Sequence, residues 1–426
     1  MLNFYLDWLN RHQFHGIRPG LIRIITILKR LNNPHLRYPT IHLAGTNGKG
    51  STSAILSSLF TKHGFKTGLY TSPHLFRLNE RFRINDSDIS DEELLEMLKI
   101  LYQITKGEKI TYFELTTALA FLYFAEKGVD IAVIETGMGG RLDATNVIRP
   151  LLSIITTIGF DHTKYLGSTL GKIAFEKAGI IKRSRPVVVG NLSKEALEVV
   201  LDRAKTLKSR SYVFNRDFGI SENKGKWNYW GEREYQNLEL SLEGLYQGHN
   251  LALALKSMEE CENLRFLKIK EDKLREALRS VRWEARFKQI HSKGKIWLLD
   301  GAHNPEGIRA LRDSLVWKNF MPFLLIFAAS NEDGDKPIKE MLLELIPLAS
   351  EVILCEFVSP RKVVTLEEWQ KILKNEPFLE KVTFCQNPEE ALYSVLNSPF
   401  SKILITGSLY FLGEVLKTGK KIGLWD

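Results

Sequence analysis

Short apolar runs alternate with longer amphipathic segments along most of this chain. Runs of strand length, rich in β-branched residues, occupy residues 40–45, 66–72, 129–137 and 151–159. Helical patterns separate them, at residues 50–64, 91–105 and 111–128. Strands that alternate with helices in this way are typical of an α/β domain. We therefore predict a mostly parallel sheet in the N-terminal part of the chain.

A second set of strand-like runs begins near residue 295. Its members are residues 295–304, 323–330, 351–357 and 402–408. Between the two sets, residues 214–236 are polar and rich in Trp and Tyr, which suggests a peripheral β-meander. The pattern predicts an N-terminal domain of residues 1–292, including a peripheral β segment at about 212–245, and a smaller α/β domain of residues 293–426.

Composition narrows the class of protein further. A chain of 426 residues with 44% hydrophobic and 26% charged residues is long enough for two or three soluble domains. The net charge of +9 favours anionic ligands such as phosphates, polycarboxylates or nucleic acid. Because the basic residues are scattered and no recognition motif accompanies them, we expect no nucleic-acid partner.

Two further features bear on where the protein acts. The three cysteines lie far apart without a C-x-x-C pair, which is typical of buried thiols in a reducing compartment. The N-terminus lacks the pattern of a signal peptide, and no apolar run has the length that crosses a bilayer. We expect a cytoplasmic protein without a membrane partner.

The segment "HLAGTNGKGSTSAIL", residues 42–56, resembles a phosphate-binding loop with unusual spacing. The common loop is G-x-x-x-x-G-K-[ST], whereas here Gly45, Gly48 and Lys49 lie closer together and Gly50 separates Lys49 from Ser51. It follows a predicted strand and opens a predicted helix, where the helix dipole and free N–H groups favour an anion. Lys49 could neutralise phosphates, and Ser51 could hold a Mg²⁺ ion. An incidental glycine-rich turn is the less favoured interpretation.

Other chemically capable side chains follow predicted strands in the first set. Glu135 ends one strand and His162 follows another. Because the carboxyl ends of parallel strands meet at one crevice, both could reach a metal ion held by phosphates. Taken singly, Glu135 could cap a helix, His162 could be a turn histidine, and Lys177 reads as a solvated helix lysine.

The second set of strands carries one comparable feature. Asp300 ends a strand in "LLDGAHNPEG", and His303 lies in the turn that follows. An Asp at a strand end commonly binds ribose hydroxyls. A simple Asp-Gly turn is about as plausible from this stretch alone.

The motifs together resemble the folylpolyglutamate synthase/dihydrofolate synthase branch of the Mur ligase family. They occur in the order "AGTNGKGS", "YTSPHL", "ETGMGGRLDATN", "DHTKYLG", "EKAGIIK", "YQGHN", "RWEARF" and "DGAHNP". The resemblance implies an N-terminal P-loop ATPase domain, with a mostly parallel sheet, and a smaller Rossmann-like C-terminal domain. One departure is Glu284, which stands where the family often has Pro and leads us to expect a less rigid linker beside Arg286.

The resemblance implies an ATP-dependent ligase that adds L-glutamate to reduced folates, and also to dihydropteroate. The substrate carboxylate would become an acyl phosphate, which the glutamate amine attacks. The protein would then work by positioning and charge neutralisation. The expected partners are these small molecules, and we expect a monomer that uses ATP and two Mg²⁺ ions.

The resemblance also assigns roles to single residues. It implies catalytic roles for Lys49, His162 and Lys177. The nucleotide would bind Gly45, Thr46, Asn47, Gly48, Lys49, Gly50, Ser51, Asn250, Arg286, Asp300 and His303. The metal would bind Ser51, Ser72, Glu135, His162 and a carbamylated Lys177.

Two other classes of protein remain open from the sequence. A cell-wall amino-acid ligase of the same superfamily would act on a uridine-nucleotide-linked substrate, for which we expect an additional N-terminal domain. A nucleotide-binding switch protein would use the glycine loop without forming a bond, and it would not need the motif around Asp300 and His303. The dependence of ADP release on glutamate and a pterin would distinguish these alternatives.

Overall fold

The computed structural model describes residues 1–16, 18–331, 334, 336–359 and 361–425. Two compact units divide the chain. The first comprises residues 1–159, 166–241 and 248–281, and the second comprises residues 160–165, 242–247 and 282–426. The helix α9, Gln247–Asn263, therefore begins at the end of a second-unit segment and continues in the first unit.

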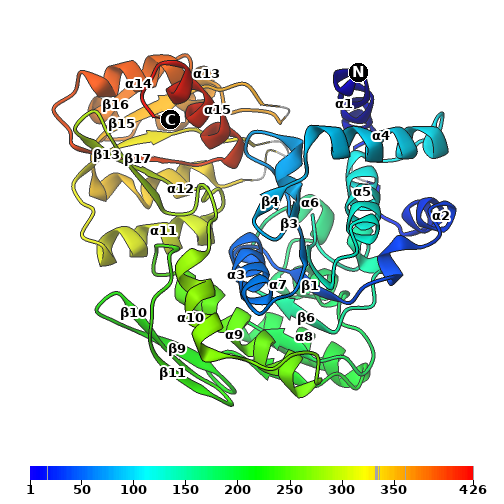
Figure 1. Cartoon of the computed structure of the whole chain (residues 1–426). Coiled ribbons are helices and arrows are strands. Elements are labelled where there is room, and N and C mark those ends of the chain that lie inside the picture. The colour runs from blue at the N-terminus through cyan, green and yellow to red at the C-terminus, as the bar shows by residue number, and fades with distance from the viewer. Residues whose placement is uncertain (17, 332–333, 335, 360, 426) are drawn as a thin grey trace. The chain divides into compact units, whose positions relative to one another are not determined.

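The first unit contains a mostly parallel eight-stranded sheet (Figure 1). Its strands in spatial order are β4 (Ser87–Asp88), β3 (Phe82–Ile84), β2 (Thr67–Tyr70), β5 (Ile131–Glu135), β1 (Thr40–Ala44), β6 (Leu152–Ile155), β7 (Val187–Val189) and β8 (Ser211–Val213). The strands from β2 to β8 in this order pair in parallel, whereas β3 and β4 are antiparallel additions at one edge. The predicted fold class is confirmed.

The helices of this unit follow the predicted alternation, with two more at the N-terminus. They are α1 (Leu2–Arg11), α2 (Ile22–Arg30), α3 (Lys49–Lys62), α4 (Asp91–Thr105), α5 (Tyr112–Glu126), α7 (Leu170–Ala178), α8 (Lys194–Thr206) and α10 (Glu271–Ser280). Short 3₁₀ turns of this unit are η1 (His12–His15), η2 (Pro34–Leu36), η3 (Leu78–Arg81) and η4 (Ala144–Val147). The single turn α6 (Thr163–Leu166) belongs to the second unit up to Tyr165. None of the described helices has the length and apolar character needed to cross a membrane.

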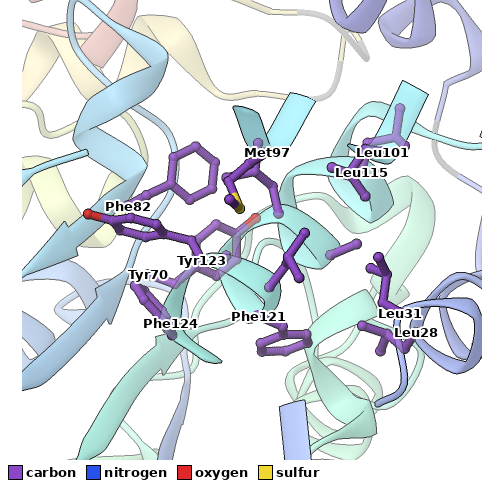
Figure 2. Packing of buried hydrophobic residues seen from close by; sticks show 14 of the residues in the cluster. Leu28, Leu31, Tyr70, Phe82, Met97, Leu101, Leu115, Phe121, Tyr123 and Phe124 are labelled. Atoms are coloured by element: carbon purple, nitrogen blue, oxygen red, sulfur yellow. The ribbon is translucent and has the colours of Figure 1, made fainter. Parts of the chain in front are cut away.

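Helix α5 is apolar on all sides because it lies inside the first unit. The side chains of Leu115, Phe121 and Phe124 are fully buried and pack with Tyr70 and other members of one cluster (Figure 2). Complete burial of such a side chain stabilises the fold by about 1.5–3 kcal/mol. The helix begins at a capping box in which the amide of Glu114 donates to the Thr111 hydroxyl and the amide of Thr111 donates to the Glu114 carboxylate.

The predicted β-meander is a separate three-stranded antiparallel sheet of β9 (Gly219–Asn223), β10 (Lys226–Trp230) and β11 (Glu234–Leu238). It packs on α9 and α10 (Figure 1): a Cβ atom on Gly248 would lie 2.2 Å from the Trp227 ring, and Arg275 donates to the carbonyl of Gln236. The sheet is shorter than the predicted segment of residues 212–245, because β8 pairs with the main sheet and residues 242–247 belong to the second unit.

The second unit contains a six-stranded sheet. Its strands in spatial order are β12 (Lys288–Ser292), β13 (Lys295–Leu299), β17 (Lys402–Thr406), β14 (Phe323–Phe327), β15 (Ala349–Cys355) and β16 (Val382–Cys385). The helices are α11 (Pro305–Trp317), α12 (Ile338–Leu343), α13 (Leu366–Leu373), α14 (Pro388–Leu396) and α15 (Leu409–Lys421), with 3₁₀ turns η5 (Ile346–Leu348) and η6 (Leu379–Lys381).

The last division between the two compact units falls between Val281 and Arg282. The sequence pattern predicts a domain boundary later in the chain, at 292/293. The cause is the hairpin of β12 and β13, which pairs antiparallel from Lys288 opposite Leu299 to Ser292 opposite Lys295. This pairing keeps residues 288–292 with the second sheet.

Candidate active site

The glycine loop joins β1 to α3 and needs glycine at two positions. A Cβ atom on Gly45 would lie 1.8 Å from the Thr156 hydroxyl oxygen. Gly48 has φ of 86°, and a Cβ atom there would lie 2.4 Å from Oδ1 of Asn250. Side chains are therefore excluded at both positions by contact, and at Gly48 also by backbone conformation.

The loop is held from the end of β6. The amide of Thr46 donates to the Thr157 carbonyl (2.8 Å), and the amide of Asn47 donates to the Thr157 hydroxyl (2.9 Å). The Thr156 hydroxyl in turn donates to the Asn47 carbonyl (2.6 Å). We did not predict either threonine from the sequence, although two hydroxyls directly after a buried strand were a usable signal.

Two lysines converge on one backbone oxygen of the loop. Nζ of Lys49 donates to the carbonyl of Gly45 (3.0 Å), and Nζ of Lys177 donates to the same oxygen (2.8 Å). Lys177 lies in the last turn of α7 and is only 3% exposed. The interpretation of Lys177 as a solvated helix lysine is therefore wrong, because its Nζ is buried at the glycine loop.

Glu135 lies beside Lys49 because β5 and β1 are neighbours in the sheet. Its Oε1 is 3.8 Å from Nζ of Lys49, and its Oε2 accepts a long hydrogen bond from the amide of Ser72 (3.4 Å). Ser72 follows β2, the other neighbour of β5. Glu135 is 4% exposed, and the buried hydroxyl of the adjacent Thr136 has no hydrogen-bond partner. The structure thus brings together the predicted residues Lys49, Ser72 and Glu135.

Helix α3 and helix α9 complete this group. Gly50 and Ser51 lie in the first turn of α3, where free amides and the helix dipole attract anions, and Ser51 is 3% exposed. Asn250 is equally buried and lies close enough to α3 to accept a weak hydrogen bond from Thr52 (3.5 Å). Both residues therefore border the glycine loop.

A buried carboxylate that we did not predict shapes the segment after β5. Oδ2 of Asp143 accepts from the amides of Gly137 and Met138, both at 2.9 Å, and Oδ1 accepts from the amide and hydroxyl of Thr145. Burial raises the pKa of Asp143, and these hydrogen bonds act in the opposite direction. Only its place in the motif "GMGGRLDATN" gave a signal in the sequence.

The remaining predicted residues lie in the second unit. Asp300 is 2% exposed and accepts hydrogen bonds from the Tyr246 hydroxyl and from the amides of Phe287 and Ala302. Burial raises the pKa of Asp300, while the nearby Arg286 guanidinium lowers it. The Asp300 carboxylate therefore already accepts hydrogen bonds from two backbone amides and one hydroxyl of the protein itself.

His303 is held in one tautomer by its neighbour. Its Nδ1 lies 2.7 Å from the Gly301 carbonyl, which can only accept, so Nδ1 carries the proton. Burial, and then the charge of Lys336, lowers the pKa of His303 to about 3. The ring is therefore neutral near pH 7, and its Nε2 is a hydrogen-bond acceptor.

His162 also belongs to the second unit and has a left-handed backbone, with φ of 51°. Its Nε2 is 3.9 Å from a carboxylate oxygen of Asp161. Its predicted place beside Glu135 stays a prediction. Among the described residues, no group of three or more His, Cys, Asp or Glu side chains is arranged to hold a metal ion; the predicted ligands instead include hydroxyls and a lysine.

Two family models match this chain, one in each half. The model of the Mur ligase middle domain matches residues 43–258, and the model of the dihydrofolate synthetase C-terminal domain matches residues 283–418. The first match spans the glycine loop, Glu135 and Lys177, and the second spans Asp300 and His303. The class that fold and site define is an ATP-dependent ligase of the Mur type.

Within that class, the chain belongs to the folylpolyglutamate synthase/dihydrofolate synthase family. It is 34% identical to the dihydrofolate synthase/folylpolyglutamate synthase of Bacillus subtilis, over 98% of this chain and 99% of that protein. The folylpolyglutamate synthase of Thermotoga maritima is 36% identical and superposes with a TM-score of 0.84, covering 99% of this chain and 98% of that one. The Escherichia coli protein solved with DHPP and ADP is 25% identical, with a TM-score of 0.88 and 98% coverage of both chains.

Proposed function

We propose that this protein uses ATP to join L-glutamate to the carboxylate of reduced folates, and also to dihydropteroate. The observation that carries the proposal is the convergence of Lys49 and Lys177 on the Gly45 carbonyl, beside Glu135 and the first turn of α3. The ammonium of Lys49 and the free amides at the start of α3 suit a polyphosphate, and Lys177 lies beside them. The relatives that carry both activities in their names support the pair of acceptors.

In this proposal the glycine loop binds the phosphates of ATP. Gly45, Thr46, Asn47, Gly48 and Gly50 supply the backbone. Lys49 leaves the carbonyls of Gly45 and Thr46 (3.0 and 3.3 Å) to neutralise phosphate charge. We also propose nucleotide contacts for Asn250 of the first unit and for Arg286, Asp300 and His303 of the second unit. Nε2 of His303 can accept from a hydroxyl because the ring is neutral. The substrate carboxylate takes the γ-phosphoryl group of ATP and becomes an acyl phosphate, while ADP leaves. The amine of glutamate then attacks the acyl carbon and displaces inorganic phosphate, which forms the amide.

The residues around Glu135 fit a magnesium ion. Mg²⁺ prefers oxygen ligands, and the buried carboxylate of Glu135 lies beside Ser72, while the hydroxyl of Thr136, the next residue in the chain, is buried without a hydrogen-bond partner. Ser51, Ser72, Glu135 and His162 would be the ligands, with a carbamylated Lys177 as a further one, and two ions as the expected number. The ions would neutralise phosphate charge. Lys177 is suited to modification because it is buried beside the loop, not in solvent.

The acceptor can be identified directly. The protein is incubated with ATP, Mg²⁺, isotopically labelled L-glutamate and either tetrahydrofolate or dihydropteroate, and the products are separated by mass. We expect the label in an amide of each pterin. Absence of label from both products would refute the proposed function, and labelling of tetrahydrofolate alone would restrict it to polyglutamylation. We also propose a cytoplasmic monomer, and size-exclusion chromatography with light scattering would test the oligomeric state.

A further inference from the structure

The carboxylate of Asp300 holds together three segments of the second unit. Oδ2 accepts from the Tyr246 hydroxyl (2.5 Å) and from the amide of Phe287 (2.9 Å), and Oδ1 accepts from the amide of Ala302 (2.9 Å). Tyr246 stands just before α9, Phe287 just before β12, and Ala302 in the turn after β13. One buried group thus joins backbone that is far apart in sequence.

Residues 285–287, which this hydrogen bonding holds in place, have an uncommon backbone conformation. Ala285 and Phe287, on either side of Arg286, both have left-handed conformations, with φ of 56° and 53°. Such values are costly for residues with side chains and persist only where surrounding contacts enforce them. Here the amide of Phe287 donates to Asp300, and the carbonyl of Ala285 accepts from the amide of Gly301 (2.9 Å). The turn at residues 300–301 therefore fixes the backbone on both sides of Arg286.

The guanidinium of Arg286 lies close to the same turn. A Cβ atom built on Gly301 would be 3.3 Å from one of its terminal nitrogens. Its charge also acts on Asp300 and on Tyr246, whose pKa values it lowers against the larger effect of burial. Arg286, Asp300 and Tyr246 are thus one electrostatic group.

We propose that Tyr246 is a positioning residue that acts through Asp300 to hold Arg286 ready for the nucleotide. The proposal rests on the proposed function for the role of Arg286. The Tyr246 side chain packs against the core of the second unit, so its hydroxyl approaches Asp300 from a fixed direction. Burial and the Asp300 charge raise the pKa of Tyr246 well above its ordinary value, and the phenol therefore remains a donor. It orients the carboxylate and takes no part in proton transfer.

The first test is Tyr246→Phe, which removes only the hydroxyl. The dissociation constant of a non-hydrolysable ATP analogue and the KM for ATP should both rise about tenfold, the loss expected for one hydrogen bond to a charged group. Hydrogen exchange of the backbone around residues 285–287 should accelerate, whereas the KM for glutamate should stay within about twofold. Tyr393→Phe, at an exposed tyrosine on α14 of the same unit, should change none of these values.

A double-mutant cycle separates action through Asp300 from an independent effect. If Tyr246 acts through Asp300, the variant Tyr246→Phe with Asp300→Asn should bind the nucleotide analogue no more weakly than Asp300→Asn alone. Should Asp300→Asn fail to fold, Arg286→Lys takes its place in the cycle with the same expectation. Trp369→Phe, at a buried residue of α13 in the core of the second unit, controls for loss of stability alone.

The outcomes distinguish this inference from the proposed function. Unchanged nucleotide binding and exchange in Tyr246→Phe, or additive effects in the cycle, would overturn the role of Tyr246 even if the wild-type protein ligates glutamate. A wild-type protein that binds the analogue but forms no glutamate amide would refute the proposed function, and the binding and exchange measurements would still decide the role of Tyr246.

Discussion

The glycine loop of the first unit and the turn at Asp300 of the second unit handle charge in opposite ways. At the loop, two lysines share one neutral carbonyl oxygen, that of Gly45. At the turn, a single carboxylate receives three donors from the protein itself. A phosphate could replace the weak neutral acceptor at the loop, whereas the hydrogen bonds of Asp300 hold the backbone in place. Substitutions at the loop should therefore impair chemistry, and substitutions at the turn should also disturb structure.

The largest effect is expected at Lys49. In Lys49→Ala the loop loses a cation that neutralises phosphate, so ADP release should fall at least about a thousandfold. The thermal midpoint should change little, because Nζ of Lys177 still donates to the carbonyl of Gly45. Lys62→Ala, at the other end of α3, is the matched control and should remain active. Near-normal ligation by Lys49→Ala would remove the loop from the mechanism.

Lys177→Arg should come next, with about a hundredfold loss of activity in a folded protein. A guanidinium keeps the charge but cannot form a carbamate, and it does not fit the buried place beside the Gly45 carbonyl as an ammonium does. Lys177→Ala should regain part of its activity with acetate. The matched control is Lys172→Arg, an exposed position on the same helix. Full activity of Lys177→Arg would contradict a role as a metal ligand.

Glu135→Ala and His162→Ala should lose less, about tenfold at low Mg²⁺, and should recover in part when Mg²⁺ is raised. Each would supply a ligand and not a proton, so mass action on the ion compensates. The Mg²⁺ dependence of ADP release measures this directly. If neither variant shifts that dependence, the metal does not bind where we propose.

Asp300→Asn should reduce stability clearly, whereas Lys49→Ala should reduce activity and leave stability almost unchanged. It should lower the free energy of unfolding by about 2 kcal/mol, because the amide of Phe287 or the Tyr246 hydroxyl loses a charged acceptor. The KM for ATP should also rise. Urea unfolding and ATP kinetics on one preparation would check both effects, and a variant with wild-type stability would show that the hydrogen bonds at Asp300 do not hold the turn.

The smallest expected effect is on the pH dependence of stability, through His303. The pKa of His303 is lowered to about 3 in the fold, against about 6.5 in an unfolded chain. The unfolded state therefore binds more protons between these values, and stability is lost as the pH falls through this window. Between pH 7 and pH 5, His303→Gln should lose about 1–2 kcal/mol less unfolding free energy than the wild type. His291→Gln, at an exposed histidine, should follow the wild type.

The sequence predicted the elements around the loop well because strand, glycine and helix signals are local there. The start of α4 is an example of such a local signal, because the amide of Glu93 donates to the hydroxyl of Ser90 just before the helix (3.2 Å). The threonines at the end of β6 and Asp143 were missed, because their contacts join residues far apart along the chain or depend on the path of a loop. Tyr246 was missed for the same reason, since nothing near it in sequence points to Asp300.

Lys177 is the plainest case of a residue whose environment the sequence alone could not predict. A lysine in a helical pattern reads as solvated, and only the packing of α7 places its ammonium against the Gly45 carbonyl. The compact units divide before the predicted boundary at 292/293, because residues 288–292 pair with β13, a partner that the local pattern does not reveal.

The most direct test of the central claim is ADP release by the wild-type protein in four mixtures. These contain ATP and Mg²⁺ with L-glutamate and a reduced pterin together, with each of the two alone, and with neither. We expect rapid ADP release only when both are present, in proportion to the amide formed, because the acyl phosphate turns over only when the amine attacks. ADP release at the same rate without glutamate or without the pterin would contradict the account.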